Sequence, residues 1–232
     1  MKQFGEEAGP KLTWIGGQDQ FESPMVDPKA VYTPVSYTHL DVYKRQTTPW
    51  TLPSNVALCV NPDETYAKVK AADGYTYYMA QALLDTVLGK LADKEAGTPA
   101  YEVLDTFPGK TLEYKEYEPL FKCAVPYAEK QHKKAFFVAC DSYVTLTDGT
   151  GVVHQAPAFG EDDARVGRKY DMPFVQLVDG SGHMTEDTPF AGLFVKDADP
   201  EVLKDLDKRG LLFDAPKFEH SYPCLLYTSR CV

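Results

Sequence analysis

The sequence predicts a mixed α/β fold that is rich in β-strands, with a small barrel-like β core and helices packed around it. Segments with strand patterns outnumber those with helical patterns, and the two kinds do not alternate regularly along the chain. Hydrophobic residues make up 44% of the 232 residues, which is enough for a proper core and excludes a disordered chain. This length allows one large domain or two small ones.

Short runs of apolar, β-branched and aromatic residues predict the strands. They are bounded by turn sequences such as Asn61-Pro62-Asp63 and Asp73-Gly74. One short strand is also compatible with the otherwise irregular segment 1–34. The predicted strands are 56–60, 65–70, 75–79, 101–107, 111–117, 135–140, 152–153, 174–178 and 211–218.

Three segments have helical patterns. Apolar residues recur at helical spacing over 79–91, which predicts an amphipathic helix. The run 161–170 opens with three acidic residues, which are favourable where the first N–H groups of a helix carry partial positive charge. Asp199 followed by Pro200 predicts the start of a third helix, with the aspartate as its cap, and Gly210 predicts its end.

The formal net charge of −10 argues against broad binding along a nucleic-acid backbone. It leaves room for a partner that is held at one end. No apolar run approaches the ~20 residues that span a bilayer, so we expect no contact with a membrane. The first residues lack the apolar core of a signal peptide, and the five cysteines form no dense framework. These observations predict a cytoplasmic protein with reduced thiols.

Two segments differ abruptly in character from their neighbours. The stretch 36–46 reads Ser-Tyr-Thr-His-Leu-Asp-Val-Tyr-Lys-Arg-Gln and resembles translated adaptor sequence, and so does the tail 224–232. We therefore expect an irregular N-terminal segment, 1–46, of which the scar-like part 36–46 does not belong to the fold, and a scar-like tail that does not belong to it either. The alternative is that both are ordinary polar segments.

The stretch 149–163 brings together residue types that carry chemistry. Gly149 and Gly151 allow a tight turn, and the two valines at 152–153 then predict a short buried strand, with His154 where it ends. Pro157 cannot donate to a strand ladder, and the acidic residues 161–163 open the next helix. A histidine and several carboxylates are thus expected to lie close together at a strand-to-helix loop.

This stretch also has less specific interpretations. Carboxylates at a helix start are usually caps, and a histidine after two valines is more often a hydrogen-bonded structural residue than a catalyst. A metal-dependent hydrolase that uses His154, Asp162 and Asp163 is a further possibility. Metal sites usually show their ligands at recognisable spacings, which these residues lack, so we expect no metal.

The stretch 47–55, Thr-Thr-Pro-Trp-Thr-Leu-Pro-Ser-Asn, predicts a rigid loop, because its two prolines exclude both a helix and a central strand. Thr47, Thr48, Thr51 and Asn55 offer hydrogen-bond donors and acceptors to a pocket, and Trp50 offers an apolar wall. The alternative is a capping loop with a packed tryptophan.

Together, the stretches 47–55 and 149–163 resemble the paired signatures of the editing domain of isoleucyl-tRNA synthetase. The resemblance continues to 218–223 and covers 47–223. Valyl and leucyl relatives usually carry Thr-Thr-Arg-Pro in place of Thr-Thr-Pro-Trp, and they lack a histidine where this chain has His154. The resemblance implies the class I editing-domain fold over 47–223. It also implies an aminoacyl-tRNA deacylase that removes valine wrongly esterified to the isoleucine tRNA.

The resemblance also implies roles for single residues. Asp163 matches the carboxylate that holds the α-ammonium group of the substrate, and His154 matches the histidine that borders the amino-acid side chain. Thr47, Thr48 and Asn55 match residues around the terminal adenosine and the scissile ester. The expected substrate-binding residues also include Trp50, Thr51 and Asp162. The family uses neither a metal nor a protein nucleophile here, so no cofactor is expected. The implied partners are the 3′ end of the tRNA and the remainder of the synthetase.

The chain departs from the family pattern before Thr47, where Gln46 replaces a third threonine. The synthetase signatures His-Ile-Gly-His and Lys-Met-Ser-Lys-Ser are absent, so activation of an amino acid with ATP is not expected, and the sequence reads as a fragment. Two readings therefore stay open. The chain is either a tRNA-dependent esterase, or a catalytically idle fragment that binds the tRNA 3′ end.

Overall fold

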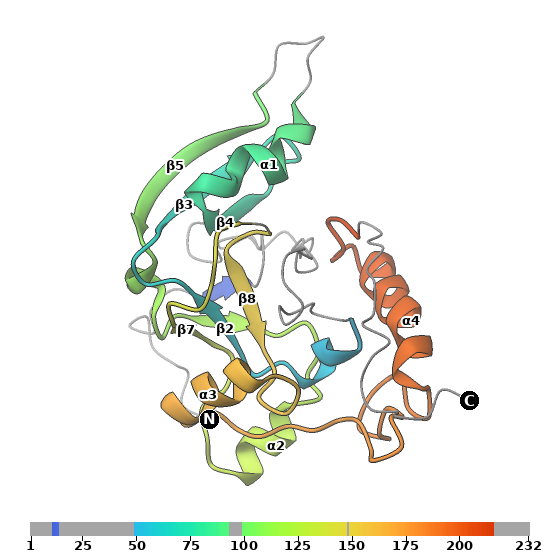
Figure 1. The fold of residues 1–232 in the computed structure, drawn as a ribbon. Coiled ribbons are helices and arrows are strands. Elements are labelled where there is room, and N and C mark those ends of the chain that lie inside the picture. The colour runs from blue at the N-terminus through green and yellow to red at the C-terminus, as the bar shows by residue number, and fades with distance from the viewer. Residues whose placement is uncertain (1–10, 14–48, 93–98, 148, 216–232) are drawn as a thin grey trace, which may run out of the picture.

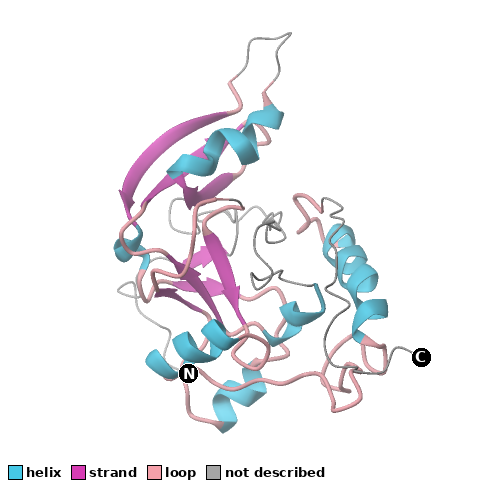
Figure 2. Cartoon of the chain, viewed as in Figure 1, coloured by secondary structure: helices cyan, strands magenta, loops and turns pink. Residues whose placement is uncertain are grey.

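The computed structural model describes residues 11–13, 49–92, 99–147 and 149–215 (Figure 1). Its strands form two sheets. The five-stranded sheet has the order β1-β6-β7-β2-β8, and the three-stranded sheet has the order β4-β3-β5. Helices lie around the sheets, as Figure 2 shows. The prediction of a mixed α/β fold rich in strands is confirmed.

The five-stranded sheet mixes parallel and antiparallel pairs. Its members are β1 (Lys11–Thr13), β2 (Ala57–Val60), β6 (Glu116–Glu118), β7 (Phe137–Cys140) and β8 (Val152–Gln155). The central strand β2 runs parallel to β7 and antiparallel to β8. All four residues of β2 are buried, because Leu58 and Val60 face one hydrophobic cluster while Ala57 and Cys59 face another. Both faces of this sheet are therefore covered.

The three-stranded sheet is antiparallel and consists of β3 (Thr65–Ala71), β4 (Thr76–Ala80) and β5 (Tyr101–Pro108). Its buried face packs against a short helical segment made of η2 (Gln81–Leu83), α1 (Leu84–Leu88) and η3 (Gly89–Leu91). The helical pattern predicted for 79–91 is thus present from Gln81 onward, and Met79 belongs to β4.

The remaining helices are η1 (Pro49–Ser54), η4 (Gly109–Leu112), α2 (Val125–Lys130), α3 (Glu161–Lys169) and α4 (Val195–Lys208). The buried residues of α3 include Val166, which packs on the cluster around Ala57 and Cys59. The α4 helix buries Ala198, Val202 and Leu206 in the cluster that also contains Leu52 of η1. The helix predicted over 161–170 is confirmed, and α2 was not predicted. The prediction that the prolines of 47–55 exclude a helix is wrong, because Pro49–Ser54 form the short 3-10 helix η1 with Pro53 inside it.

Two predicted strands are wrong in whole or in part. Within 111–117, the chain first completes η4, and Tyr114 then adopts a φ of +63°, so only Glu116 and Tyr117 extend into β6. The segment 174–178 forms no ladder, and only Val178 makes an isolated bridge. The Gln131 side chain instead bonds both the backbone N–H and the carbonyl of Phe174, at 2.9 and 2.8 Å, in place of a neighbouring strand.

The C-terminal helix also differs from its prediction. It begins at Val195, four residues before the predicted cap, and Pro200 lies inside it. Gly210 follows its end with a φ of +67°, as predicted for a helix stop. Residues 211–215 form no strand, and the rest of the predicted strand 211–218 lies outside the described residues. The adaptor-like segments 36–46 and 224–232 also lie outside them.

Among the described helices, none is both long enough and apolar enough to cross a lipid bilayer.

Candidate functional site

The backbone dihedral angles confirm the predicted glycine turn before β8. Gly149 and Gly151 have φ angles of +79° and +74°, which disfavour side chains. A Cβ at Gly151 would lie 2.5 Å from the Cβ of Ala80, so the turn also needs a small residue for space. The Tyr66 hydroxyl donates a 2.6 Å hydrogen bond to the Gly151 carbonyl and accepts one from the Asn61 backbone. This tyrosine ties the turn to the second sheet.

His154 lies inside β8 and not after its end, which corrects the predicted position. It pairs with Leu58 in the antiparallel ladder, and Gln155 still accepts a hydrogen bond from the Val56 backbone. The ladder stops before Pro157, two residues later than predicted. Because facing residues share one side of a sheet, the His154 side chain lies on the same face as Leu58. It is 4% exposed.

Thr51 and His154 bring the two motifs into contact. The Thr51 Oγ1 atom lies 3.1 Å from the His154 Nε2 atom, and both side chains are buried. Either atom can donate, because the donor depends on the tautomer of the imidazole ring. A threonine of η1 and a histidine of β8, 103 residues apart, therefore share one buried hydrogen bond.

Trp50 makes the second link between the motifs. Its ring meets Phe159 edge to face, with centroids 4.9 Å apart and an interplanar angle of 80°. Its backbone N–H donates a 2.9 Å hydrogen bond to Asp199 Oδ1 on α4. Trp50 is therefore held between the loop that follows β8 and the C-terminal helix.

Asn55 is buried, and its side-chain amide is engaged within the protein. The Asn55 Nδ2 atom donates to the Ala57 carbonyl at 2.8 Å, and the Tyr117 hydroxyl donates to Asn55 Oδ1. Its backbone N–H donates to the Leu52 carbonyl at 3.1 Å. These bonds fasten the end of η1 to β2 and β6, so Asn55 fixes where the loop ends.

The acidic residues 161–163 occupy the first turn of α3, as predicted. Asp163 is half-buried, and its carboxylate folds back over Gly160, since a Cβ at that glycine would lie 2.4 Å from Asp163 Oδ2. Asp162 turns toward Arg165, whose Nη2 atom lies 3.1 Å from its Oδ1. The two neighbouring carboxylates therefore differ in surroundings, because only Asp162 makes this ion pair.

The α3 helix packs on the face of the sheet opposite the His154 side chain. Val166 shares a cluster with Ala57 and Cys59, whereas His154 lies on the face of Leu58. Burial raises the pKa of the Cys59 thiol, and the charge of Asp163 adds to this rise. Asp163 therefore belongs to the helix that covers one face of β2, whereas the His154 side chain lies on the other face, and the expected close grouping of the histidine with the carboxylates stays a prediction.

A buried ion cluster next to α3 was missed by the sequence reading. Asp141, directly after β7, has a side chain that is only 8% exposed. Its two oxygens accept from Arg165 Nη1 and Nη2 at 3.0 and 2.9 Å, and Lys169 Nζ lies 3.4 Å away. The Arg165 hydrogen bonds lower the pKa of the Asp141 carboxyl. The available signal was the pair of basic residues four positions apart on one helix face.

Thr47 and Thr48 lie outside the described residues, so the structure does not place them. Within the described residues, no group of three or more His, Cys, Asp or Glu side chains is arranged to hold a metal ion.

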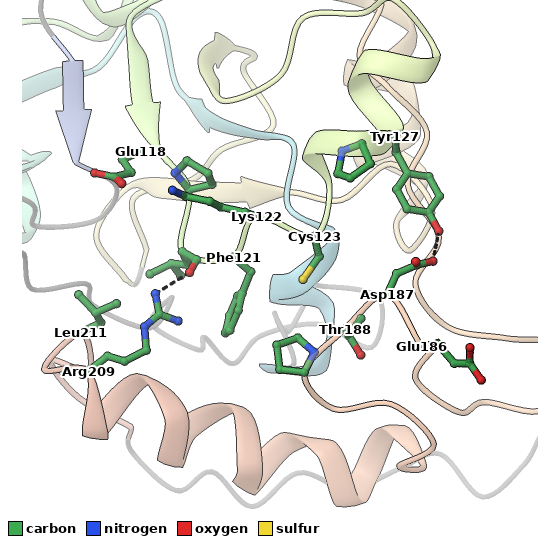
Figure 3. A pocket seen from close by; sticks show the side chains of 14 residues that line it. Glu118, Phe121, Lys122, Cys123, Tyr127, Glu186, Asp187, Thr188, Arg209 and Leu211 are labelled. Atoms are coloured by element: carbon green, nitrogen blue, oxygen red, sulfur yellow. Dashed lines mark hydrogen bonds between the residues drawn. The ribbon is translucent and has the colours of Figure 1, made fainter.

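A cavity of about 740 Å³ lies elsewhere, between the segments 118–127 and 186–189 and the end of α4 (Figure 3). Arg209 at its edge donates to the Leu120 carbonyl at 2.7 Å, and Tyr127 donates to Asp187. None of the described site residues predicted from the sequence lines it.

Comparison with known proteins gives a consistent result. No protein-family model matches the chain. The chain is 47% identical over 178 residues to isoleucine–tRNA ligase of Clostridium novyi and 44% identical over 177 residues to that of Thermus thermophilus. It is 45% identical over 184 residues to the cytoplasmic isoleucine–tRNA ligase of Mus musculus. Each match covers 76% of this chain but only 14 to 16% of the relative. The chain thus spans about a sixth of the length of these relatives.

Solved structures of editing domains share the fold. The crystal structure of GlLeuRS-CP1 superposes with a TM-score of 0.54 at 16% identity, covering 70% of this chain and 75% of that one. The editing domain of the P. knowlesi cytosolic leucyl-tRNA synthetase gives a TM-score of 0.51 at 14% identity, covering 71% and 80%. At this identity the likeness concerns the fold alone.

Proposed function

This chain is homologous to one segment of isoleucine–tRNA ligases and has the fold of CP1 editing domains, and from this premise we propose that it is a post-transfer editing domain. In this proposal, residues 47–223 form the domain and hydrolyse the ester of valine on the isoleucine tRNA. The partners are the 3′ end of that tRNA and the remainder of the synthetase. The reaction takes place in the cytoplasm.

The physical need for such a reaction is well defined, and isoleucyl enzymes are its standard example. A pocket that admits isoleucine gains only ~1–3 kcal/mol over a side chain one methylene shorter. Binding alone therefore leaves valine attached to a fraction of the tRNA. A second, smaller pocket that excludes isoleucine removes the error by hydrolysis.

The contact between Thr51 and His154 carries the proposal. It unites the two sequence motifs at one buried point, at 3.1 Å. The imidazole ring is fixed by the β8 ladder on one side and by the threonine on the other. A rigid, buried ring is suited to border the valine side chain and to exclude the longer isoleucine by size.

Asp163 supplies the charge that the substrate requires. The α-ammonium group of the esterified amino acid is a cation, and a half-buried carboxylate binds it more strongly than an exposed one. Asp162 adds a second negative charge near the proposed ammonium site, although it also forms an ion pair with Arg165. In the proposal Asp163 therefore orients the amino acid.

The loop of η1 surrounds the terminal adenosine and the scissile ester. Thr47 and Thr48 contact the ester, Trp50 supplies an apolar wall, and Asn55 fixes the end of the loop through its bonds to β2 and β6. Water attacks the ester carbonyl, aided by a ribose hydroxyl of the tRNA. The proposal requires no protein nucleophile, metal or other cofactor.

Hydrolysis of valyl-tRNA with the isoleucine anticodon tests the proposal. We expect turnover by this chain, loss of turnover in Asp163→Ala, and unchanged turnover in Glu161→Ala, which removes an exposed carboxylate from the same helical turn. Equal turnover in the two variants would contradict the role of Asp163.

One sequence feature favours a second candidate function. Gln46 stands where the family usually has a third threonine, so the loop that contacts the ester is altered. An idle fragment would bind the aminoacylated 3′ end without hydrolysing it. Binding of a non-hydrolysable valyl-adenosine analogue, together with no turnover, would support that candidate over the esterase.

A further inference from the structure

We propose that Asp199 of α4 is a positioning residue that fixes Trp50 and the adjacent Thr51 of the proposed editing site. Its Oδ1 atom accepts the 2.9 Å hydrogen bond from the Trp50 backbone N–H, across 149 residues of sequence. An acceptor on a packed helix holds this backbone donor at one position, which mobile water does not do. The loop is therefore held at a defined point.

The local sequence around Asp199 carries two unfavourable features. Its carboxylate is half-buried, and desolvation raises its pKa against the opposing effect of the Trp50 amide. Pro200 follows it inside α4, and a proline disfavours helical geometry at the residue before it. Neither feature stabilises the helix itself, and the bond from Trp50, together with the nearby charge of Lys196, opposes the desolvation of the carboxylate.

The hydrogen bond between Trp50 and Asp199 lies next to both contacts that join the stretches 47–55 and 149–163. Trp50 presents its ring to Phe159, 4.9 Å away, and the next residue, Thr51, contacts His154. A shift of the Trp50 backbone therefore moves both the aromatic wall and Thr51, the residue that contacts His154.

Tryptophan fluorescence tests the hydrogen bond between Trp50 and Asp199 independently of catalysis. The chain has two tryptophans, so a Trp14→Phe background leaves Trp50 as the sole reporter. In Asp199→Ala we expect acrylamide quenching of Trp50 to rise about twofold, because the loop opens locally to solvent. Asp199→Asn keeps an acceptor and is expected to behave like the parent chain. Asp197→Ala, which removes an exposed carboxylate from the same helix, is the matched control.

A second variant distinguishes displacement of the loop from a loss of folding. Asp199→Glu keeps the charge and helix propensity but moves the carboxylate outward by one methylene, so it displaces the loop in a folded chain. We expect its Trp50 quenching to rise as well, with a cooperative thermal transition retained.

The kinetic part of the test rests on the proposed function. Deacylation of valyl-tRNA by Asp199→Ala and Asp199→Glu should lose kcat by about 10- to 100-fold, since misplacing a reacting group by about 1 Å costs that much, with KM little changed. Asp199→Asn should restore it. Quenching that matches Asp197→Ala in both disruptive variants would overturn the positioning role. If the parent chain shows no turnover, the proposed function fails, and the quenching series alone decides the role of Asp199.

Discussion

Asp163 occupies a position where one carboxylate can serve a helix end or a ligand. It lies in the first turn of α3 and folds back over Gly160, yet it is not fully buried. A pure cap would contribute to stability and nothing to catalysis. A ligand-binding carboxylate would contribute mainly to catalysis, so the two roles have separable measurements.

Replacing Asp163 with alanine should affect catalysis far more than folding. The lost charge-assisted bond to the substrate ammonium, worth ~1.5–3 kcal/mol, predicts a fall in kcat/KM of about 10- to 100-fold. The free energy of unfolding should fall by only about 0.5–1 kcal/mol, from the helix-end interaction. Deacylation kinetics and urea unfolding measure the two effects. A large drop in melting temperature with kcat/KM retained would make Asp163 a cap.

Replacing His154 with alanine should relax the size limit of the proposed pocket. Removing a ring that is 4% exposed opens space beside the amino-acid side chain. Hydrolysis of correctly charged isoleucyl-tRNA should rise by about tenfold or more relative to the parent chain. Thr51→Val, which keeps the ring and removes the hydroxyl at 3.1 Å, should show a smaller rise. If the His154→Ala variant does not hydrolyse isoleucyl-tRNA faster than the parent chain does, the size-exclusion role is refuted.

At the scale of elements, α3 is fixed to β7 by the bond between Arg165 and Asp141. Asp141→Asn should lower the free energy of unfolding at pH 7 by about 1–2 kcal/mol, since Arg165 is 46% exposed and solvent screens part of the interaction. Asp162→Asn, which removes the more exposed partner of the same arginine, should cost less.

The same pair predicts a dependence on pH. The pKa of Asp141 is lowered in the folded chain, so its stabilisation is present above the unfolded pKa of about 3.9 and is lost as the pH falls through the folded pKa. The stability difference between the parent chain and Asp141→Asn should therefore shrink on acidification below about pH 4. Urea unfolding at pH 7 and pH 3 measures it, and a difference that grows in acid would contradict the assignment.

The turn before β8 offers a test of packing against backbone strain. Gly151→Ala should destabilise by about 2–4 kcal/mol, because it adds a contact of 2.5 Å to a positive φ of +74°. Gly192→Ala is the matched control, since its φ is +77° and nothing lies within 4 Å of the added Cβ. Equal losses in thermal unfolding would show that strain alone sets the cost at Gly151.

The sequence pattern identified the elements whose partners are local or whose burial is complete. The strands β2, β3, β4, β5 and β7 and the helix α3 lie close to their predicted limits because their periodicity and turn residues suffice. The start of α4 was misplaced because Asp199-Pro200 mimics a cap, although Val195, Ala198 and Val202 already recur at helical spacing.

Other features depend on distant partners, which a pattern does not reveal. The segment 174–178 forms no ladder, because the Gln131 side chain bonds the Phe174 backbone and only Val178 makes a bridge, to Met184. The contact between Thr51 and His154 joins residues 103 apart, so only the paired motifs indicated it. Asp141 and Asp199 act through partners on other elements, and the one signal at Asp199, its resemblance to a helix cap, indicated a different role.

At the scale of the whole molecule, the acidic charge bears on how the proposed tRNA substrate is bound. With a net charge of −10, the chain gains little from contacts along the tRNA backbone. A minihelix that carries only the acceptor end and its valine should therefore be hydrolysed with a KM within about threefold of that for the whole tRNA. Deacylation kinetics on both substrates measure this. A KM at least tenfold higher for the minihelix would show that this chain binds beyond the 3′ end.

The bond between Trp50 and Asp199 also sets an order of events during translation. The ribosome adds about 5–20 residues per second, so the 149 residues between the partners take about 7–30 seconds to make. Throughout that interval the nascent loop lacks its carboxylate, while β3 and β4 can already pair with each other. A chain that stalls before α4 would therefore lack the carboxylate that fixes the Trp50 backbone, and also the α4 residues that complete the cluster around Leu52.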